Sequence, residues 1–134
     1  MTNEAAAKVP LISIVDDDVS VRVAMMNLIR SLGFAARSFE SADSYLGSPE
    51  RRETACIVSD VQMPGTNGLE MQRRLAAQND QTPIIFITAF PEANLERRAR
   101  DAGAVCFLTK PFNSSALIGC IEQALKGRSR QVCC

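Results

Sequence analysis

The stretch ISIVDDD, residues 12–18, is an apolar run that ends on three consecutive carboxylates. Together with the apolar residues just before it, from Val9, it predicts a strand that is buried on both faces, as in a parallel sheet. Closely spaced carboxylates are costly there, because two like charges about 4 Å apart at an effective dielectric constant of about 20 repel by roughly 4 kcal/mol. Something else in the protein has to offset this repulsion, and its nature bears directly on function.

Strand-like and helix-like segments alternate along the rest of the chain. Strands are predicted over 9–15, 34–39, 55–60, 83–88 and 104–110. Helices are predicted over 21–32, 42–46 and 69–79, over 94–101, and from 113 or 114 to about 127. In the helix over 69–79, the inner side is expected to carry Leu69, Gln72, Leu75 and Ala76. This alternation is typical of an α/β fold in which a five-stranded parallel sheet is covered by helices on both faces. We expect one domain over 9–126, with an N-terminal tail at 1–8 and a C-terminal tail or linker stub at 127–134.

Composition excludes several classes of function. The chain has 134 residues with 15 basic and 15 acidic side chains, so charge gives no reason to expect non-specific binding to nucleic acid or to an anionic membrane. It contains no histidine, which removes imidazole base catalysis and makes a zinc site very unfavourable despite five cysteines. It has no apolar run of 18 residues and no signal-peptide pattern, so we expect a cytoplasmic protein.

Polar side chains follow four of the five predicted strands. Asp16 and Asp17 come after the first strand and Asp60 after the third, while Thr88 and Lys110 close the fourth and fifth. Parallel strands all end at the same edge of a sheet, so these side chains are expected to meet there. Carboxylate oxygens without histidine or thiolate partners suit a hard cation such as Mg²⁺, or Mn²⁺. A lysine and a hydroxyl facing that ion suit a phosphoryl group, which indicates phosphoryl transfer.

Four motifs at these strand ends resemble one known family. VDDD at 15–18, SDVQMPGTNGLE at 59–70, ITAF at 87–90 and LTKPF at 108–112 are similar to the receiver domain of two-component response regulators, and most of all to receivers of the FixJ type. The resemblance covers about 10–125. It implies the flavodoxin-like and CheY-like strand order 2-1-3-4-5.

The resemblance also implies a role for each of the acidic residues. Asp60 matches the phosphoacceptor, which takes a phosphoryl group from the phosphohistidine of a sensor kinase. Asp17 matches the carboxylate that binds the metal ion directly, and Asp16 the neighbour that acts through a metal-bound water. The backbone carbonyl of Gln62 matches a further metal ligand. Lys110 matches the lysine that pairs with the phosphoryl group.

Other matched positions concern the conformational switch. Thr88 matches a hydroxyl that moves to the phosphoryl group, and Phe107 matches an aromatic residue, often a tyrosine, that swings inward behind it. The bond between Lys110 and Pro111 is expected to be cis. Gly68 matches the glycine at which the loop after the phosphoacceptor turns into its helix.

Two positions are expected to tune the lifetime of the phosphorylated state. Gln62 lies two residues after the phosphoacceptor position and is uncharged, but it is able to orient a water molecule. Phe90 lies two residues after Thr88, where an apolar ring would slow the access of water.

Alternatives remain at the level of single residues and of the whole chain. Asp18 is expected to cap the following helix and not to bind metal. The arginines of 97–100 are either a solvated helix face or part of a partner surface. DDDVS at 16–20 also approximates the signature of haloacid-dehalogenase-like phosphatases, with Asp16 as nucleophile and Asp18 as acid, although that fold needs a later acidic pair and a cap. A receiver that no longer accepts phosphate is a further alternative.

The resemblance implies signalling partners and not a turnover enzyme. We expect a sensor histidine kinase upstream, and downstream an effector protein or a fused DNA-binding domain, reached through the fourth helix, fifth strand and fifth helix. A phosphorylation-dependent homodimer would use the same surface. The chain is expected to be either a stand-alone receiver or the receiver piece of a longer transcription factor, and we expect it not to bind nucleic acid directly.

Overall fold

The computed structural model describes residues 9–63, 65–90 and 92–133, with side chains described as far as Lys126. The predicted tail at 1–8 lies outside this part of the chain. Five strands form one parallel sheet in the order β2-β1-β3-β4-β5. They are β1 (Leu11–Val15), β2 (Ala35–Phe39), β3 (Thr54–Asp60), β4 (Ile84–Thr88) and β5 (Cys106–Thr109). The predicted fold class and strand order are therefore confirmed.

Five α-helices connect and follow the strands. They are α2 (Val19–Ser31), α3 (Ala42–Leu46), α4 (Gly68–Ala77), α5 (Ala93–Asp101) and α6 (Ser114–Cys133). A 3-10 turn, η1 (Pro49–Glu53), precedes β3 and was not predicted. The end expected for the last helix was wrong, because α6 continues past Gly127 to Cys133. A single glycine costs a helix only about 1 kcal/mol, and no proline follows it.

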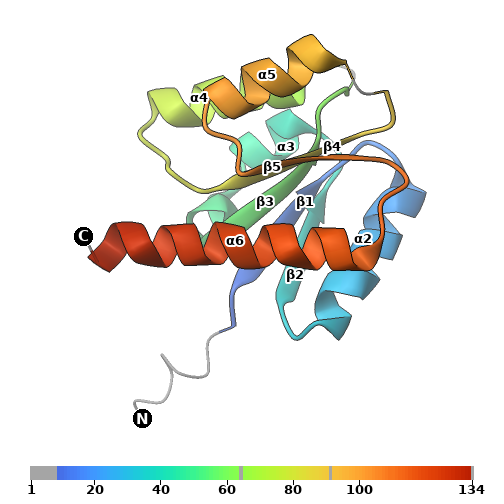
Figure 1. Cartoon of the computed structure of the whole chain (residues 1–134), viewed down its shortest axis with the longest axis vertical. Helices are drawn as coiled ribbons and strands as arrows, with labels where there is room; N and C mark the ends of the chain where they lie inside the picture. Colours follow the sequence, from blue (N-terminus) through green and yellow to red (C-terminus); the bar gives the residue numbers. More distant parts are fainter. Residues whose placement is uncertain (1–8, 64, 91, 134) are drawn as a thin grey trace.

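The helices form a layer on each face of the sheet. Figure 1 shows α4 and α5 on one side and α6 on the other, with the strands between them. One apolar cluster joins the sheet to α2 and α6 through residues such as Ile29 and Ile121. The other joins it to α3, α4 and α5 through residues such as Tyr45, Leu75 and Ala99. The strands are apolar on both faces, as the sequence indicated, because both faces are covered.

The register of the central strands brings the two acidic segments side by side. Val15, the last residue of β1, pairs with Ser59 of β3, so the next residues, Asp16 just after β1 and Asp60 at the end of β3, lie at the same level. Thr88 at the end of β4 pairs with Thr109 at the end of β5, directly before Lys110. The four strand ends that carry polar side chains thus share one edge.

Candidate functional site

Three carboxylates gather at this edge. Asp16, Asp17 and Asp60 each offer an oxygen, and these oxygens all lie within 4.8 Å of one another. Asp16 is fully buried and Asp60 is 8% exposed, whereas Asp17 faces solvent. A donor set of oxygen atoms alone, open to water on one side, fits Mg²⁺ or Mn²⁺ and does not fit zinc or copper.

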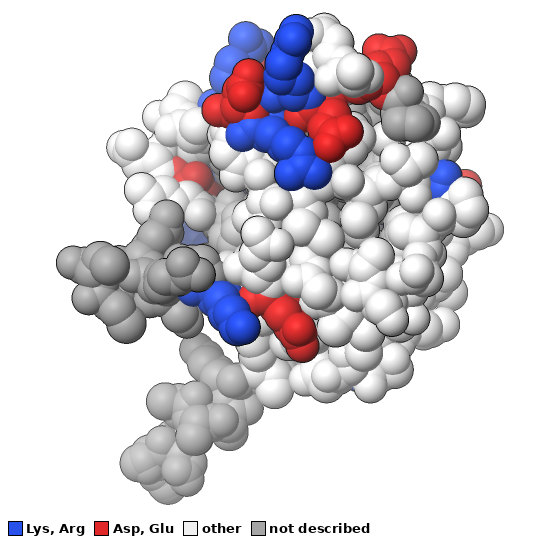
Figure 2. Space-filling model, in the orientation of Figure 1, with Lys and Arg blue, Asp and Glu red and all other residues white. Residues whose placement is uncertain are grey.

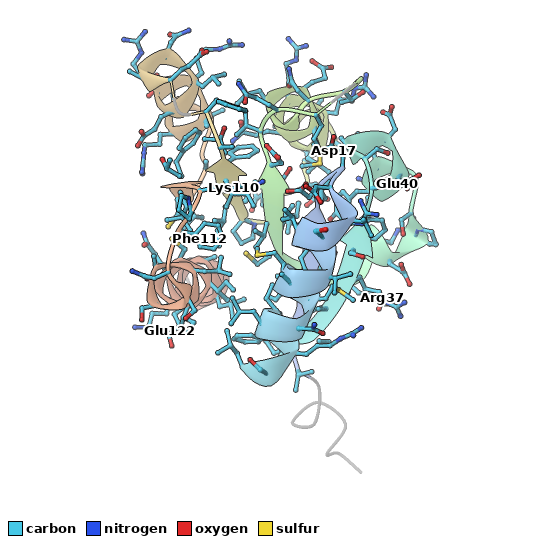
Figure 3. All side chains as sticks on the ribbon, turned by 90° about the vertical axis from the view of Figure 1, so that its right-hand side faces the viewer. Asp17, Arg37, Glu40, Lys110, Phe112 and Glu122 are labelled. Atoms are coloured by element: carbon cyan, nitrogen blue, oxygen red, sulfur yellow. The ribbon has the colours of Figure 1, made fainter. Side chains whose placement is uncertain are left out.

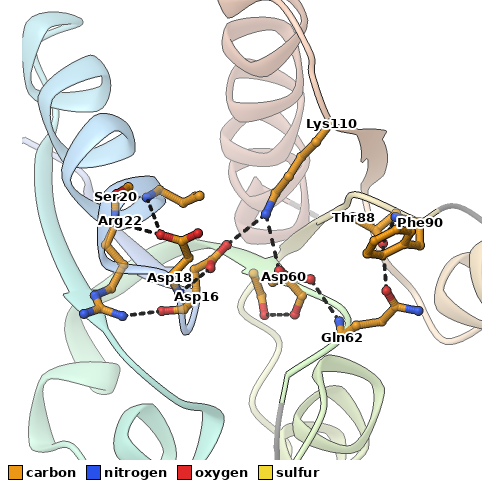
Figure 4. A network of polar contacts seen from close by, with 11 residues as sticks. Asp16, Asp18, Ser20, Arg22, Asp60, Gln62, Thr88, Phe90 and Lys110 are labelled. Carbon is orange, nitrogen blue, oxygen red and sulfur yellow. Dashed lines mark hydrogen bonds and ion pairs between the residues drawn. The ribbon is translucent and has the colours of Figure 1, made fainter.

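Lys110 supplies the positive charge that the acidic cluster requires. Its Nζ atom lies 3.3 Å from Oδ2 of Asp16 and 3.3 Å from Oδ2 of Asp60, so one ammonium group bridges both buried carboxylates (Figure 4). The backbone holds it there, because the Lys110 amide donates a 2.7 Å hydrogen bond to the carbonyl of Thr88. Figure 3 shows Lys110 and Asp17 at the same edge of the sheet.

The pKa values of Asp60 and Lys110 are both shifted by burial and by neighbouring charges. Burial raises the pKa of Asp60 above its ordinary value, and this outweighs the lowering by the Gln62 amide and by Lys110. Burial alone would lower the pKa of Lys110, but attraction to Asp16 and Asp60 and the hydrogen bonds to them outweigh it and raise the pKa. Lys110 is therefore firmly cationic at neutral pH.

The acidic loop after β1 is held by its own backbone. The Asp18 amide donates to Oδ1 of Asp16 at 2.9 Å, and the Asp18 carboxylate accepts from the amides of Ser20 and Val21. Asp18 is thus the N-cap of α2, as predicted. Arg22, one turn into α2, donates from Nη1 to the Asp16 carbonyl at 2.7 Å. This arginine was missed at the level of sequence, where only its spacing of four residues from Asp18 was visible.

Gln62 contacts both the acidic residue and the hydroxyl at the next strand end. Its backbone amide donates to Oδ1 of Asp60 at 2.9 Å, and its side-chain Oε1 lies 3.5 Å from Oγ1 of Thr88. Thr88 is fully buried and also accepts a 3.1 Å hydrogen bond from the Phe90 amide. The Phe90 ring itself is 71% exposed beside the site.

The remaining matched positions lie in β5 and in the loop after β3. Phe107 is buried, in the cluster that also contains Phe86 and Ala99. The bond between Lys110 and Pro111 is cis. Gly68 begins α4 with its amide bonded to the Val61 carbonyl at 2.9 Å.

Gly68 has a reason to lack a side chain that the sequence did not show. A Cβ atom there would lie 2.8 Å from the Asp60 carbonyl oxygen and 2.8 Å from Cε1 of Phe86. The helix therefore starts in close contact with the strand end that carries Asp60. Close backbone approach, and not an unusual φ angle, explains this glycine.

The expected arginine face is solvated. Arg97, Arg98 and Arg100 are all exposed on α5, and Arg100 pairs with Glu96 on its own helix at 2.9 Å. Figure 2 shows basic and acidic side chains intermingled over α4 and α5, where Glu70 also pairs with Arg74. Charge at this surface is balanced locally, so it makes no strong field of one sign.

The family model for the response regulator receiver domain matches residues 12–122. The chain belongs to this family. Its members are signalling proteins of two-component systems. The match covers β1 from Ile12, the other four strands in full, and every strand-end residue described above.

Individual relatives agree with this assignment and with the FixJ-like character of the motifs. Response regulator protein TmoT of Ectopseudomonas mendocina is 41% identical over 116 residues, which cover 87% of this chain and 53% of TmoT. Transcriptional regulatory protein FixJ of Bradyrhizobium diazoefficiens is 36% identical over 115 residues, 86% of this chain and 56% of FixJ. The solved structure of the response regulator StyR superposes with a TM-score of 0.84 at 42% identity, covering 92% of this chain and 64% of that one. The chain spans about half the length of the curated relatives.

The phosphatase alternative is not favoured. The comparisons give no support to it, and the geometry opposes it, because Asp16 is fully buried and the Asp18 carboxylate is used as a helix cap. Among the described helices, none combines the length and the apolar character needed to cross a membrane.

Proposed function

We propose that this receiver domain is a phosphoacceptor switch in which Asp60 takes a phosphoryl group from the phosphohistidine of a sensor kinase. The observation that carries the proposal is the position of Lys110, whose Nζ atom lies 3.3 Å from the carboxylates of both Asp16 and Asp60, beside Asp17. A nucleophile, a cation and an acidic cluster of oxygen ligands together are what phosphoryl transfer to a carboxylate requires.

The residues of the chain divide the chemistry among them. A carboxylate oxygen of ionised Asp60 attacks phosphorus, the bond from phosphorus to the kinase imidazole nitrogen breaks, and the electron pair leaves with the imidazole. The Nζ atom of Lys110, which is hydrogen-bonded to Oδ2 of Asp60, would then form an ion pair with the phosphoryl oxygens. Mg²⁺ or Mn²⁺, held by Asp16, Asp17, Asp60 and the Gln62 carbonyl, would supply further neutralisation of the phosphoryl charge.

The proposed switch begins at Thr88. Its hydroxyl now lies between the Gln62 side chain and the Phe90 amide, and it would exchange these partners for a phosphoryl oxygen. Phe107, buried behind it in β5, would repack with the hydroxyl. The surface formed by α5, β5 and α6 would then change and alter the affinity for a partner. Gln62 and Phe90 flank the site and would set how quickly water removes the phosphoryl group.

The relatives support a regulatory output. FixJ is named a transcriptional regulatory protein, and this chain corresponds to about half of it. We propose that this chain is cytoplasmic, that a sensor histidine kinase is its phosphoryl donor, and that its output is an effector protein or a fused DNA-binding domain. A homodimer through the same surface would be favoured by phosphorylation.

The central test is phosphorylation by a small donor. Incubation with acetyl phosphate and Mg²⁺ should add one phosphoryl group to the intact protein, and peptide mapping should place it on Asp60. Asp60→Asn should remove the labelling, and Asp17→Asn should reduce it strongly without moving the site. Label found on Asp16 instead would contradict the proposal and restore the phosphatase alternative.

A further inference from the structure

The two ends of α5 are held very differently. At the N-terminal end, Glu92 is the N-cap and makes no side-chain capping hydrogen bond, and Ala93 and Asn94 are exposed. This end follows Thr88 and Phe90 by only a few residues. An N-terminus without a side-chain cap leaves its first amide groups to solvent, so it is the easier end to displace.

The C-terminal end of α5 is closed by backbone hydrogen bonds. Gly103 has a φ of +107°, and its amide donates to the Arg100 carbonyl at 2.9 Å. The Ala104 amide reaches back to the Ala99 carbonyl at 3.0 Å. This is the Schellman arrangement, in which two amides beyond the helix satisfy carbonyls of its last turn.

A side chain from α4 makes a second bond to the same carbonyl. The Gln72 side chain donates from Nε2 to the Ala99 carbonyl oxygen at 3.2 Å. Ala99 is fully buried and is the only buried residue of α5, and Gln72 is 6% exposed. A buried amide group is costly to desolvate unless it is hydrogen-bonded. Separating the Gln72 side chain from the Ala99 carbonyl would leave both groups unpaired, so their hydrogen bond holds α4 and α5 together at this point.

We propose that Gln72 is a positioning residue that anchors the C-terminal end of α5 to α4, so that α5 pivots near Ala99 and its N-terminal end carries the movement. The pivoting rests on the proposed function, whereas the anchor does not. Ala93 lies six residues before Ala99, a lever of roughly 9 Å at 1.5 Å per residue. A tilt of about 10° would therefore move the N-terminal end by roughly 1.5 Å and leave the anchored end in place.

The location of the anchor explains how such a tilt would reach the rest of the receiver. Ala99 packs in the same apolar cluster as Phe107 of β5. At the other end of the lever, Ala93 follows Thr88 by only five residues. A change at Thr88 would thus turn α5 against Phe107 without detaching it from α4. Within the output surface, α5 would tilt as one rigid helix against β5 instead of loosening from α4.

The anchor is tested in the unphosphorylated protein by amide hydrogen exchange. Gln72→Met keeps the approximate length and the apolar volume of the side chain but removes the donor. The amides of Gly103 and Ala104 should then exchange roughly tenfold faster than in the unchanged protein. Met71→Leu, at a neighbouring buried position of α4, is the matched control and should leave both rates within about twofold. Equal acceleration in the two variants, or none in Gln72→Met, would refute the anchor.

A measurement on the unchanged protein guards against a variant that fails to fold. The side-chain NH₂ of Gln72 should exchange slowly with solvent in nuclear magnetic resonance spectra and should stay slow when beryllofluoride and Mg²⁺ mimic the phosphoryl group. Fast exchange in either state would refute the anchor as well.

The pivot is tested by the profile of exchange along α5 after addition of beryllofluoride and Mg²⁺. In the unchanged protein, we expect altered exchange at 92–97 and unaltered exchange at 101–104, and in Gln72→Met we expect the alteration to reach both segments. A uniform change in the unchanged protein, or the same gradient in both proteins, would refute the pivot. No response at all, with Asp60 left unlabelled by acetyl phosphate, would refute the proposed function while the slow Gln72 NH₂ exchange still supported the anchor.

Discussion

At the scale of single residues, two side chains of the same type have different roles because their surroundings differ. Asp18 and Asp60 are both aspartates that follow or adjoin a strand, yet one caps a helix in solvent and the other is 8% exposed against a lysine. The sequence could predict both assignments, because each depends on a neighbour a few residues away or on a strand end. It could not predict the crowding at Gly68, which depends on where the Phe86 ring lies.

Gly68 offers a prediction in which packing opposes helix propensity. Gly68→Ala should destabilise the protein by about 1–3 kcal/mol, because the new Cβ would lie 2.8 Å from the Asp60 carbonyl oxygen and from the Phe86 ring. Gly119→Ala in α6 is the matched control, since nothing lies within 4 Å of its Cβ position. It should stabilise by about 0.5–1 kcal/mol. Urea unfolding of the two variants measures this, and a neutral or stabilising Gly68→Ala would contradict the structure.

Tyr45 provides a pH-dependent prediction on the opposite side of the molecule from α6. Its pKa is raised above 10.0 mainly by burial, which outweighs the lowering by Thr54. Because the folded-state pKa is the higher one, the contribution of Tyr45 to stability is complete below about pH 10 and is lost as the pH rises through the folded-state pKa. The unfolding free energy of Tyr45→Phe should therefore fall less between pH 8 and pH 11 than that of the unchanged protein. Parallel curves would show that Tyr45 ionises equally in both states.

At the scale of elements, the helices and strands follow from local pattern more closely than their inner faces do. The helix expected over 69–79 is present as α4, and its predicted inner residues Gln72 and Leu75 are buried. Met71, also fully buried, was missed, and Ala76 was placed inside but is exposed. A helix of ten residues has few turns from which to fix its rotation, so the direction of its buried stripe depends on which neighbour packs on it.

The start of α2 gives a prediction that separates capping from metal binding. Asp18→Ala should destabilise the protein by about 1 kcal/mol, because the amide of Ser20 loses its 2.8 Å acceptor. Asp18→Asn should retain most of that stability, since an amide oxygen also caps. Neither variant should weaken Mg²⁺ binding, measured by titration calorimetry, by more than about twofold. A tenfold loss of Mg²⁺ affinity in Asp18→Asn would instead make Asp18 a metal ligand.

At the scale of the whole molecule, the site exists because the sheet is parallel. Lys110 and Asp16 are 94 residues apart in sequence, and Lys110 and Asp60 are 50 apart, yet one amine bridges both carboxylates. The alternation of strands and helices sufficed to predict this meeting, because it requires every strand to end at the same edge. The bond between Gln72 and Ala99 was beyond reach, because nothing in a local pattern indicates which carbonyl a buried amide will face.

Removal of the bridging cation should expose the repulsion that it offsets. Lys110→Met should destabilise the protein by about 3 kcal/mol in the absence of divalent ions, because two buried carboxylates lose their common partner. Mg²⁺ should restore a larger share of stability to this variant than it adds to the unchanged protein, since the ion then carries the compensation alone. Thermal unfolding with and without 10 mM EDTA or Mg²⁺, at roughly neutral pH, compares the two. If Mg²⁺ raised the Tm of Lys110→Met and of the unchanged protein equally, Lys110 and the ion would not be neutralising the same carboxylates.

The span between Asp16 and Lys110 also has a consequence during synthesis. The first strand emerges from the ribosome early. The buried carboxylate of Asp16, which follows it, pairs with Lys110 only when β5 has been made and has joined the sheet next to β4. A nascent or prematurely terminated chain therefore holds Asp16 and Asp60 without the amine that bridges them. If Asp60 is the phosphoacceptor that we propose, the ability to accept a phosphoryl group would be gained in a single late step, and unfinished copies would not compete for the phosphoryl donor.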